Sequence, residues 1–391
     1  MSLTPSDVLQ AEADTLPRTD LLGLTFHELA AWLGERGQPT FRAKQLAGWM
    51  YTSLAPDFAA MRNLPTALRE QLARAASIAG PRVRREVKAK DGRTRKLLLE
   101  LADGRLIETV LMLYPASGES RARATVCVST QAGCAYGCTF CATGQMGFDR
   151  HLTAGEIVAQ VLHFARELRA QPWQTPDGET IDRVSNLVFM GMGEPFHNYD
   201  NTLKAVRILN MAEGLNIGAR HMTISTVGLV PGILRLAGEP LQVNLAISLH
   251  APNDAMRLRT MPVTRKYPIA QVLDACRQYV ERTNRQVTFE YVLLAGVNDA
   301  PEHARELAAL LAPLRQLCHV NLIPVNKTAA SYAVPSGEAI RAFRETLRAG
   351  GVSNSVRAER GDDIAAACGQ LSTHERRGQL HVANAAFDAT S

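Results

Sequence analysis

The chain has 391 residues, of which 46% are hydrophobic and 21% charged, with a formal net charge of +5 at pH 7. This length can bury one large core, or a large core beside a small domain, and the composition excludes a disordered or fibrous protein. No apolar stretch approaches the ~18 residues of a membrane span, and the first residues lack the basic and apolar regions of a signal peptide. Seven cysteines are an odd number that does not suggest a secreted disulfide framework, so we expect a cytoplasmic protein.

The first 80 residues are expected to contain an arm and a small domain. Residues 1–20 show no periodicity and are expected to be a flexible N-terminal arm. Residues 21–80 are expected to form a helical accessory domain, whose first helix starts with the capping-box pair Thr25 and Glu28. Two further helices are predicted to follow, and their inward-facing side chains to be Phe41, Leu46, Trp49, Met50, Leu68 and Leu72.

Two cations lie in the first turn of the second predicted helix. Arg42 and Lys44 stand where the helix dipole disfavours positive charge. A bound phosphate would compensate for this cost, and simple exposure to solvent is the other explanation. The sequence leaves both explanations open.

Residues 81–118 are expected to form a connecting β-meander. The pairs Asp91-Gly92 and Asp103-Gly104 separate runs of strand-forming residues, which is a strong hairpin signal. Residues 81–96 carry eight basic side chains and two acidic ones. Such a stripe is suited to binding phosphates, but it equally fits the solvated face of a hairpin. The eight basic residues are Arg82, Arg84, Arg85, Lys88, Lys90, Arg93, Arg95 and Lys96.

The pattern of residues 119–358 alternates between strands and helices. Short apolar strands that are each followed by a helix are typical of parallel sheets covered by helices. Six such units, rather than eight, predict an α/β fold with a partial (β/α)6 barrel. Residues 359–391 are expected to be a C-terminal segment with a polar tail. The strands are predicted at 125–129, 186–190, 222–226, 242–248, 286–294 and 319–324, and the helices near 153–167, 201–211, 231–237, 269–282, 301–311 and 336–349.

Three cysteines lie in one loop after the first predicted barrel strand. The spacing of Cys134, Cys138 and Cys141 supplies three thiolates. A cluster of four irons and four sulfurs would then keep one iron without a protein ligand, which is a position for a small molecule. A zinc site is the alternative, but zinc usually takes a second Cys or His pair, and none accompanies this loop. The spacing therefore indicates an iron–sulfur cluster with chemistry at its open iron.

Polar and glycine residues follow the other predicted barrel strands. Ligands bind at the carboxyl ends of the strands in β/α barrels, so these residues indicate a ligand there. The glycines at 191 and 193 would let the backbone approach a cofactor closely. The strand-end segments are 191–195, 225–228, 248–250, 296–298 and 324–326.

These motifs together resemble the RlmN family of radical S-adenosylmethionine (SAM) enzymes, which methylate carbon 2 of adenine in ribosomal and transfer RNA. The resemblance covers residues 20–372 and is most specific at the cysteine loop, at 191–195 and at 360–371. It implies a radical SAM partial barrel. The other matching stretches are 22–25, 41–46, 63–65, 127–131, 248–253 and 321–324.

The resemblance also implies roles for individual residues. Cys368 would carry a methyl group as S-methylcysteine, Cys127 would resolve the covalent adduct by forming a disulfide with Cys368, and Glu108 would accept a proton. The implied ligands of one [4Fe-4S] cluster are Cys134, Cys138 and Cys141, and the implied SAM contacts are Gly193, Glu194, Ser225, Ser248, Leu249, His250 and Asn326.

The reaction implied by the resemblance uses two SAM molecules per turnover. One methylates Cys368, and the other is cleaved to a radical that activates the methyl group. The implied substrates are large-subunit ribosomal RNA and the tRNA adenosine next to the anticodon, whose base must leave its stack. A reducing system such as flavodoxin would restore the thiols, and the protein would act as a monomer away from membranes. The basic hairpin and the helical domain are the candidates for gripping RNA.

Two other functions fit parts of this pattern. Cfr-type relatives share the cluster and both catalytic cysteines but methylate carbon 8 of adenosine; the complete 191–195 motif and the 368–371 context favour carbon 2. An RNA-binding or sensor protein with a cluster but no catalysis would need neither Cys127 nor Cys368.

Single residues also have ordinary structural interpretations. Taken alone, Cys127 would be a buried strand cysteine, Cys368 a helix-end core residue and His250 a satisfied structural histidine. Cys276 and Cys318 have no motif around them and are interpreted as packing residues.

Two segments look longer than the corresponding family connections, at 115–124 and 170–183. The first lies between Glu108 and Cys127. The second contains a Pro-Asp-Gly turn.

Overall fold

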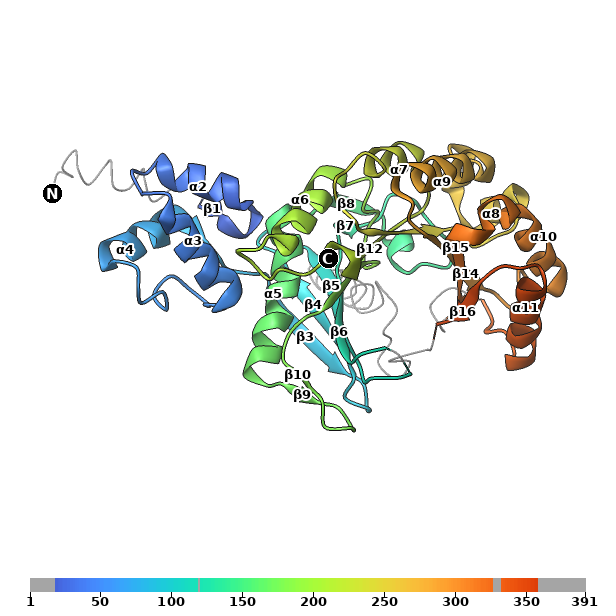
Figure 1. The fold of residues 1–391 in the computed structure, drawn as a ribbon, viewed down its shortest axis with the longest axis horizontal. Coiled ribbons are helices and arrows are strands. Elements are labelled where there is room, and N and C mark those ends of the chain that lie inside the picture. Colours follow the sequence, from blue (N-terminus) through green and yellow to red (C-terminus); the bar gives the residue numbers. More distant parts are fainter. Residues whose placement is uncertain (1–17, 119, 326–331, 358–391) are drawn as a thin grey trace, which may run out of the picture.

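The computed structural model describes residues 18–118, 120–325 and 332–357. A ten-stranded sheet runs through the molecule (Figure 1). The first seven strands in its spatial order are parallel neighbours, and β16 and β3 form its two unpaired edges in the described part of the chain. That order is β16 (Asn354–Val356), β15 (Cys318–Pro324), β14 (Val287–Leu293), β13 (Asn244–Ser248), β12 (Met222–Thr226), β11 (Asn186–Phe189), β6 (Arg123–Cys127), β5 (Leu106–Tyr114), β4 (Thr94–Glu100) and β3 (Arg82–Lys88).

The predicted partial barrel is confirmed. Its six strands and six helices lie close to their predicted bounds, and the extended stretch before the C-terminal segment adds β16 as a seventh parallel strand. The helix α8 (Asp254–Thr260) was not predicted. No helix in the described residues is long and apolar enough to cross a membrane. The barrel helices are α5 (Ala154–Ala170), α6 (Tyr199–Asn210), α7 (Val230–Leu236), α9 (Ile269–Thr283), α10 (Pro301–Leu311) and α11 (Gly337–Ala349).

Several short elements connect these strands and helices. The segment predicted to contain a Pro-Asp-Gly turn is a small hairpin of β9 (Trp173–Gln174) and β10 (Thr180–Ile181). A second hairpin, β7 (Gln131–Gly133) and β8 (Phe148–His151), encloses the cysteine loop. The remaining short turns are η1 (Leu21–Gly23), η2 (Gly48–Thr52), η3 (Thr143–Met146), η4 (Ala219–His221), η5 (Pro262–Arg265) and η6 (Ala312–Leu317).

The predicted meander is present as β3, β4 and β5, but it does more than connect two domains. β5 pairs antiparallel with β6, from Val110 opposite Cys127 to Tyr114 opposite Arg123. Eight of the nine residues of β5 are buried, because the strand is covered on both faces. The meander therefore extends the barrel sheet.

The basic stripe of residues 81–96 is not one surface. The side chain of Lys96 is fully buried and that of Arg95 is only 13% exposed, because β4 lies inside the sheet between β3 and β5. Arg82 and Arg84 are exposed but lie beside Glu100. The exposed cations therefore lie in the edge strand β3 and in the turn that follows it, and the prediction of an eight-residue basic stripe is wrong.

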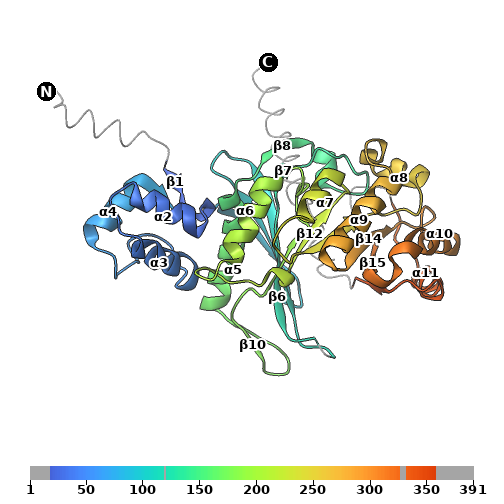
Figure 2. The same cartoon turned by 45° about the horizontal axis from the view of Figure 1, so that its top comes forward.

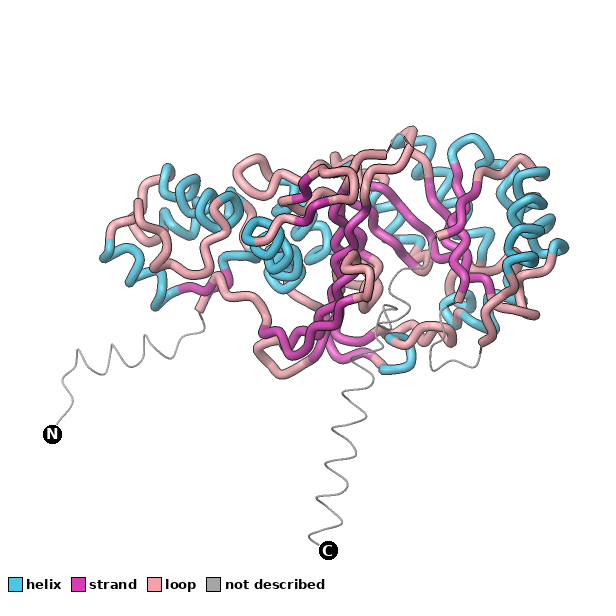
Figure 3. Tube along the Cα trace, turned by 90° about the horizontal axis from the view of Figure 1, so that it is seen from below, coloured by secondary structure: helices cyan, strands magenta, loops and turns pink. Residues whose placement is uncertain are grey.

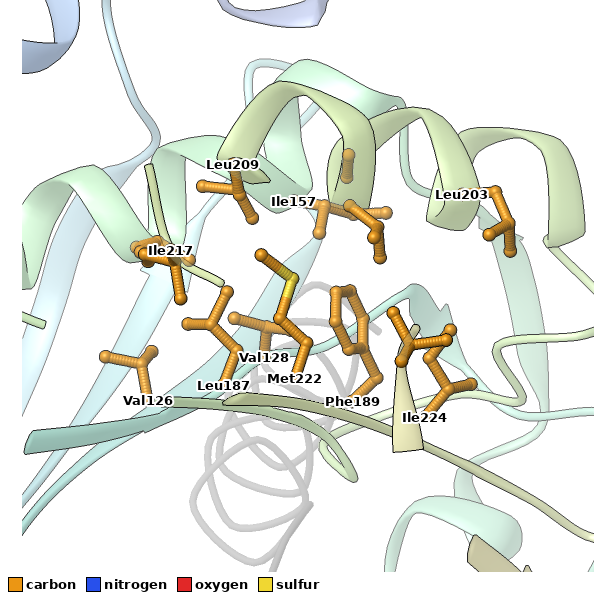
Figure 4. Close-up of a cluster of buried hydrophobic side chains, with 14 of the residues drawn as sticks. Val126, Val128, Ile157, Leu187, Phe189, Leu203, Leu209, Ile217, Met222 and Ile224 are labelled. Carbon is orange, nitrogen blue, oxygen red and sulfur yellow. The ribbon is translucent and has the colours of Figure 1, made fainter. Parts of the chain in front are cut away.

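Alternation along the parallel strands gives the sheet two different faces. Val126, Leu187 and Met222 are fully buried and point towards α5 and α6, where they meet apolar helix side chains (Figure 4). Their immediate neighbours in the strands point to the opposite face, which becomes the barrel interior. That interior face is markedly polar and includes Thr223, Ser225, Ser248, Thr288, Glu290 and Asn321.

The N-terminal helices form a small unit beside α5 and α6 (Figures 2 and 3). They are α2 (Phe26–Gly34), α3 (Phe41–Ala47) and α4 (Thr66–Ala75), and the predicted capping box of Thr25 and Glu28 starts α2. One predicted core residue is wrong: Phe41 is 55% exposed, and the Arg42 guanidinium lies 4.8 Å from the centre of its ring. The predicted side chains that are buried as expected are Leu46, Met50, Leu68 and Leu72.

The end of the predicted N-terminal arm takes part in this unit. β1 (Thr19–Asp20) pairs in parallel with β2 (Ala76–Ser77), so the last two residues of the arm are fixed, and residues 1–17 lie outside the described residues. The Asp20 carboxylate packs against Gly155 at the start of α5, where a Cβ atom would overlap it. Burial raises the pKa of Asp20 to about 6. The helical unit is therefore packed tightly on the first barrel helix.

The helix-facing side of the sheet provides a stability test. Leu187→Ala should destabilise the protein by about 2–5 kcal/mol, because it removes a fully buried side chain from between β11 and the helices. The same substitution at Leu258, which is 39% exposed in α8, should change the urea midpoint little. Equal shifts for both variants would contradict the assignment of this face as the core.

Candidate active site at the carboxyl edge of the barrel

A pocket lies at the carboxyl ends of the barrel strands, where the sequence predicted a ligand. It contains about 870 Å³ of space outside the protein atoms, including the part open to solvent. The three cysteines of the loop lie on one side, and strand-end residues of β11 to β15 form the rest. The predicted site residues in its lining are Cys134, Cys138, Cys141, Gly193, Glu194, Ser225, Ser248 and His250.

The β7–β8 hairpin holds the cysteine loop at this edge. The Cys134 amide donates to the Gly147 carbonyl at 2.7 Å, and the Cys141 amide donates to the Cys138 carbonyl at 3.1 Å. A Cβ atom on Gly144 would lie 2.9 Å from the backbone of Cys138, so only glycine lets the loop close this tightly. The fold of the loop thus turns three thiols towards one pocket.

The three thiols fit a cluster better than a single metal ion. No three His, Cys, Asp or Glu side chains in the described ranges converge closely enough for one ion. A cube of four irons takes each thiolate on a different iron, so its ligands need not meet at a point. Burial raises the pKa of the Cys134 thiol to about 12 and raises that of Cys138 further, so iron binding must favour the thiolates.

Glu194 is fixed by the main chain at the floor of the pocket. Its two oxygens accept hydrogen bonds from the Phe196 amide at 3.0 Å and the Val227 amide at 2.8 Å. Its own amide donates to the Gln131 side chain at 2.9 Å. Burial raises the pKa of Glu194 to about 7, and the two amide donors oppose this rise. Such a carboxyl is suited to a cationic ligand, which would favour its charged form.

The two glycines before Glu194 have a packing role that the sequence did not predict. A Cβ atom on Gly191 would lie 2.6 Å from the Val128 carbonyl oxygen, and one on Gly193 would lie 2.5 Å from the Gln131 Cβ atom. Gly193 also has a φ of 101°, which side chains rarely adopt. Although both glycines line the pocket, they allow this loop to pack against the segment from Val128 to Gln131.

His250 is held in a strained conformation and faces the pocket. Its φ is 58°, and its Nδ1 accepts a hydrogen bond from the Val292 amide at 3.0 Å. Burial, together with the charge of Arg257, lowers the pKa of His250 to about 3. The ring is therefore neutral near pH 7, with its proton on Nε2 as a donor. The structural interpretation of His250 is confirmed by its hydrogen bond, and contact with a ligand stays a prediction that its place in the pocket lining allows.

Glu108 and Cys127 lie on the interior face but outside the pocket lining. Glu108 forms an ion pair with Lys96 of β4, with 2.7 Å between Nζ and Oε2, and both side chains are buried. Cys127 is 5% exposed and packs with Val110 and Met190, of which Met190 lines the pocket. The antiparallel pairing of β5 with β6 brings both residues towards the same edge.

Three predicted residues remain to be placed. Asn326 and Cys368 lie outside the described residues. The Leu249 side chain is fully buried beneath the strand end, and its amide donates to the Glu290 carbonyl at 3.1 Å. Cys276 and Cys318 are buried, in agreement with packing roles.

Sequence reasoning missed several residues at this site. The Gln131 side chain connects the Glu194 amide to His151 and His197. Its position in the matching stretch 127–131 is the sequence feature that could have identified it. Glu290 lines the pocket, accepts from the Asn321 side chain at 2.8 Å and has its pKa raised by burial. A lone carboxylate in an apolar strand is the pattern that could have revealed it.

Comparison with known families agrees with this geometry. Residues 128–308 match the radical SAM superfamily, and residues 19–78 match the ribosomal RNA large subunit methyltransferase N-terminal domain. The protein is thus a radical SAM protein, a class that uses a [4Fe-4S] cluster and SAM.

The particular family follows from close relatives. A probable dual-specificity RNA methyltransferase RlmN from Geobacillus thermodenitrificans is 48% identical over 367 residues, covering 94% of this chain and 96% of its own. One from Chloroflexus aurantiacus is 51% identical over 352 residues, covering 88% and 90%. A crystal structure of a radical SAM methyltransferase from Sphaerobacter thermophilus has 52% identity and a TM-score of 0.83, covering 90% of this chain and 99% of its own. The chain belongs to the RlmN family of radical SAM methyltransferases.

The raised pKa of Glu194 predicts pH-dependent binding of SAM. We expect Glu194 to contact the SAM ammonium group, which only its ionised carboxylate attracts. With a pKa of about 7, this carboxyl is mostly protonated at pH 6. The dissociation constant should therefore fall by roughly five- to tenfold as the pH rises from 6 to 7.5. Equilibrium binding measurements would show this, and Glu194→Gln should bind weakly without that dependence. A wild-type constant that does not change with pH would contradict the ion pair.

The buried pair of Lys96 and Glu108 predicts a large effect on stability. Lys96→Met should destabilise the protein by about 3–5 kcal/mol, because it leaves a buried carboxylate without its partner. The double variant Lys96→Met/Glu108→Gln should recover part of that loss in urea unfolding. Arg277→Met, which breaks an exposed pair with Glu281, is the control and should leave the midpoint unchanged. A Lys96→Met midpoint equal to that of the control would contradict the prediction.

Proposed function

We propose that the protein methylates carbon 2 of adenosine in large-subunit ribosomal RNA and in tRNA next to the anticodon. The observation that carries this proposal is the single pocket shared by the three loop cysteines and Glu194, Ser225, Ser248 and His250. The names of the relatives, dual-specificity RNA methyltransferases, support an RNA substrate. The match of residues 19–78 to the N-terminal domain of a ribosomal RNA large subunit methyltransferase also supports an RNA substrate.

The residues present fit both cofactors of the class. Cys134, Cys138 and Cys141 would hold the cluster, and SAM would lie across the strand ends. Glu194 would take its ammonium group, and the remaining contacts would be Gly193, Ser225, Ser248, Leu249, His250 and Asn326. When bound, the cluster and SAM supply a one-electron cleavage that can activate an unreactive C–H bond.

The chain's own cysteines would carry the one-carbon unit. The Cys368 thiolate takes a methyl group from a first SAM by displacement, since thiolates are the competent nucleophiles. The radical chemistry that a second SAM would supply would remove one hydrogen atom from that methyl group, so that its carbon could bond to carbon 2 of the base, and the cluster would take back one electron from the adduct. Glu108 accepts the proton from carbon 2. The Cys127 thiolate then attacks the Cys368 sulfur and the sulfur–carbon bond breaks. Its electron pair takes up a proton, which completes the methyl group, and the Cys127–Cys368 disulfide is reduced by an external dithiol or electron donor.

The positions of Cys127 and Glu108 support these roles. Both are buried on the barrel-interior face, and the Val110 that pairs with Cys127 is two residues from Glu108 on the same face of β5. The Ser129 hydroxyl donates to the Glu108 carbonyl at 2.6 Å and accepts from the Met192 amide at 2.9 Å. Glu108 is therefore attached to the loop that carries Glu194.

Two exposed features are suited to gripping RNA. Phe41 and Arg42 present an aromatic ring and a cation beside each other on the helical unit, a combination on which bases stack. The edge strand β3 presents exposed cations. We divide the chain accordingly into the arm 1–20, the RNA-binding unit 21–80, the meander 81–118, the barrel 119–358 and the C-terminal segment 359–391.

The setting of the reaction follows from its substrate. Ribosomal RNA and tRNA place the protein in the cytoplasm, where a flavodoxin-like donor can reduce the cluster and the disulfide.

Nucleoside mass spectrometry tests the proposal directly. Reconstituted protein, reductant and SAM should convert unmodified ribosomal RNA and tRNA to products containing 2-methyladenosine under anaerobic conditions. Formation of 8-methyladenosine would instead assign the protein to the Cfr-type reaction. Cleavage of SAM without methylated adenosine in either RNA would contradict the substrate.

A cysteine variant tests the route. Cys127→Ala should accumulate RNA covalently attached to the protein, because nothing then attacks the Cys368 sulfur. A nuclease-sensitive shift on a denaturing gel would reveal this adduct. Cys276→Ala removes a different buried cysteine in the core of α9 and should release product normally. Normal turnover by Cys127→Ala would exclude the resolving role.

A further inference from the structure

Arg257 of α8 is a fully buried cation with a complete set of uncharged acceptors. Its side chain has no exposed surface. Nε donates to the Leu249 carbonyl, Nη1 to Thr264 Oγ1 and the Tyr267 carbonyl, and Nη2 to the carbonyls of Val227 and Ser248, at 2.6–3.3 Å. All five N–H groups are therefore satisfied by neutral oxygens.

None of these contacts neutralises the charge of Arg257. Among the described residues, none of the ion pairs involves it. The exposed Asp254 attracts it only through space. Burial lowers its pKa to about 10, so it stays charged at neutral pH. Buried charges are ordinarily paired, so a counter-charge is expected nearby.

The cysteine loop is the neighbour that can supply this counter-charge. The Thr139 amide of the loop donates to the carbonyl of Thr260, in the last turn of α8, at 2.9 Å. Met261, the next residue, lines the pocket together with the cysteines. The carbonyls that accept from Arg257 Nη2 belong to Val227 and Ser248, which line the same pocket as the three cysteines.

We propose that Arg257 is a positioning residue whose buried positive charge is the counter-ion of the iron–sulfur cluster and raises the cluster's reduction potential. Reduction adds one negative charge to a cluster already held by three thiolates. A fixed cation in a low-dielectric site favours this reduced form. The same guanidinium joins the ends of β12 and β13 through Val227 and Ser248, so it also fixes the pocket wall. This inference rests on the cluster assignment, and not on the RNA substrate.

The cluster potential, followed by electron paramagnetic resonance during a redox titration, tests this proposal. Arg257→Gln should lower the ratio of reduced to oxidised cluster at a fixed potential at least tenfold, a shift of about 59 mV for one electron. Arg257→Lys keeps the positive charge, so its ratio of reduced to oxidised cluster should be close to that of the wild type. Arg259→Gln, which removes an exposed charge from the same helix, should leave it unchanged.

A second pair of variants keeps Arg257 and changes only whether a negative charge lies beside its guanidinium group. Thr264→Asp places a carboxylate where the hydroxyl accepts from Nη1, and it should lower the ratio as Arg257→Gln does. Thr264→Val removes that acceptor without adding charge and should leave the ratio near that of the wild type. This pair decides the question if Arg257→Gln does not fold.

Two results would overturn the proposal. Unchanged potentials in Arg257→Gln and Thr264→Asp, with only a lower unfolding temperature of the cluster-free protein, would make Arg257 a structural residue alone. Wild-type protein that takes up no iron would remove the cluster assignment itself. Failure of RNA methylation with a normal cluster would count against the substrate and leave this proposal standing.

Discussion

The two-faced character of the parallel strands is the constraint on which the rest of the structure depends. Each strand places one set of side chains under the helices and the next set in the barrel interior. On the helix side, residues such as Leu187 and Met222 are fully buried and apolar. On the interior side, positions such as Ser225, Ser248 and Glu290 are polar. The apolar face stabilises the fold. The side chains of the interior face therefore do not have to form a hydrophobic core, and polar groups there are available to bind a ligand.

Hydrogen bonds from side chains beside the pocket connect the strand ends and loops that surround it. Gln131 joins the cysteine segment to the Glu194 loop, and Ser129 joins that loop to β5. Arg257 joins the end of β12 to the end of β13 by donating to the carbonyls of Val227 and Ser248. These side chains fix the backbone to which the ligand-facing groups are attached. Pre-organisation of this kind holds the backbone of the pocket in place. Glu194 and His250 are in addition fixed by main-chain amides that donate to their own side chains.

The sequence predicted the barrel closely because strand and helix periodicities are local, and the strands were long and apolar enough to show them. The pocket residues were predicted because the motifs stand at strand ends. What failed depended on tertiary contacts. Lys96 looks like part of a basic surface until β4 is seen between two other strands, with Glu108 beside it. Phe41 looks like a core residue, although its ring faces solvent. The helix α8 is only seven residues long, and its N-cap, Asn253, is a weak signal by itself.

The antiparallel direction of β5 has a consequence for the kind of chemistry this barrel can hold. In a barrel made only of parallel strands, groups at the working edge come from strand ends and loops, which are the more mobile parts of a fold. Because β5 runs the other way, Glu108, near its beginning, lies at the edge reached by Cys127 at the end of β6. The carboxylate that we propose as the proton acceptor therefore lies inside a strand, in fixed register with its neighbours. The pleat of the sheet sets the position of the Glu108 side chain. The surrounding loops can therefore change in length or sequence during evolution without moving this carboxylate.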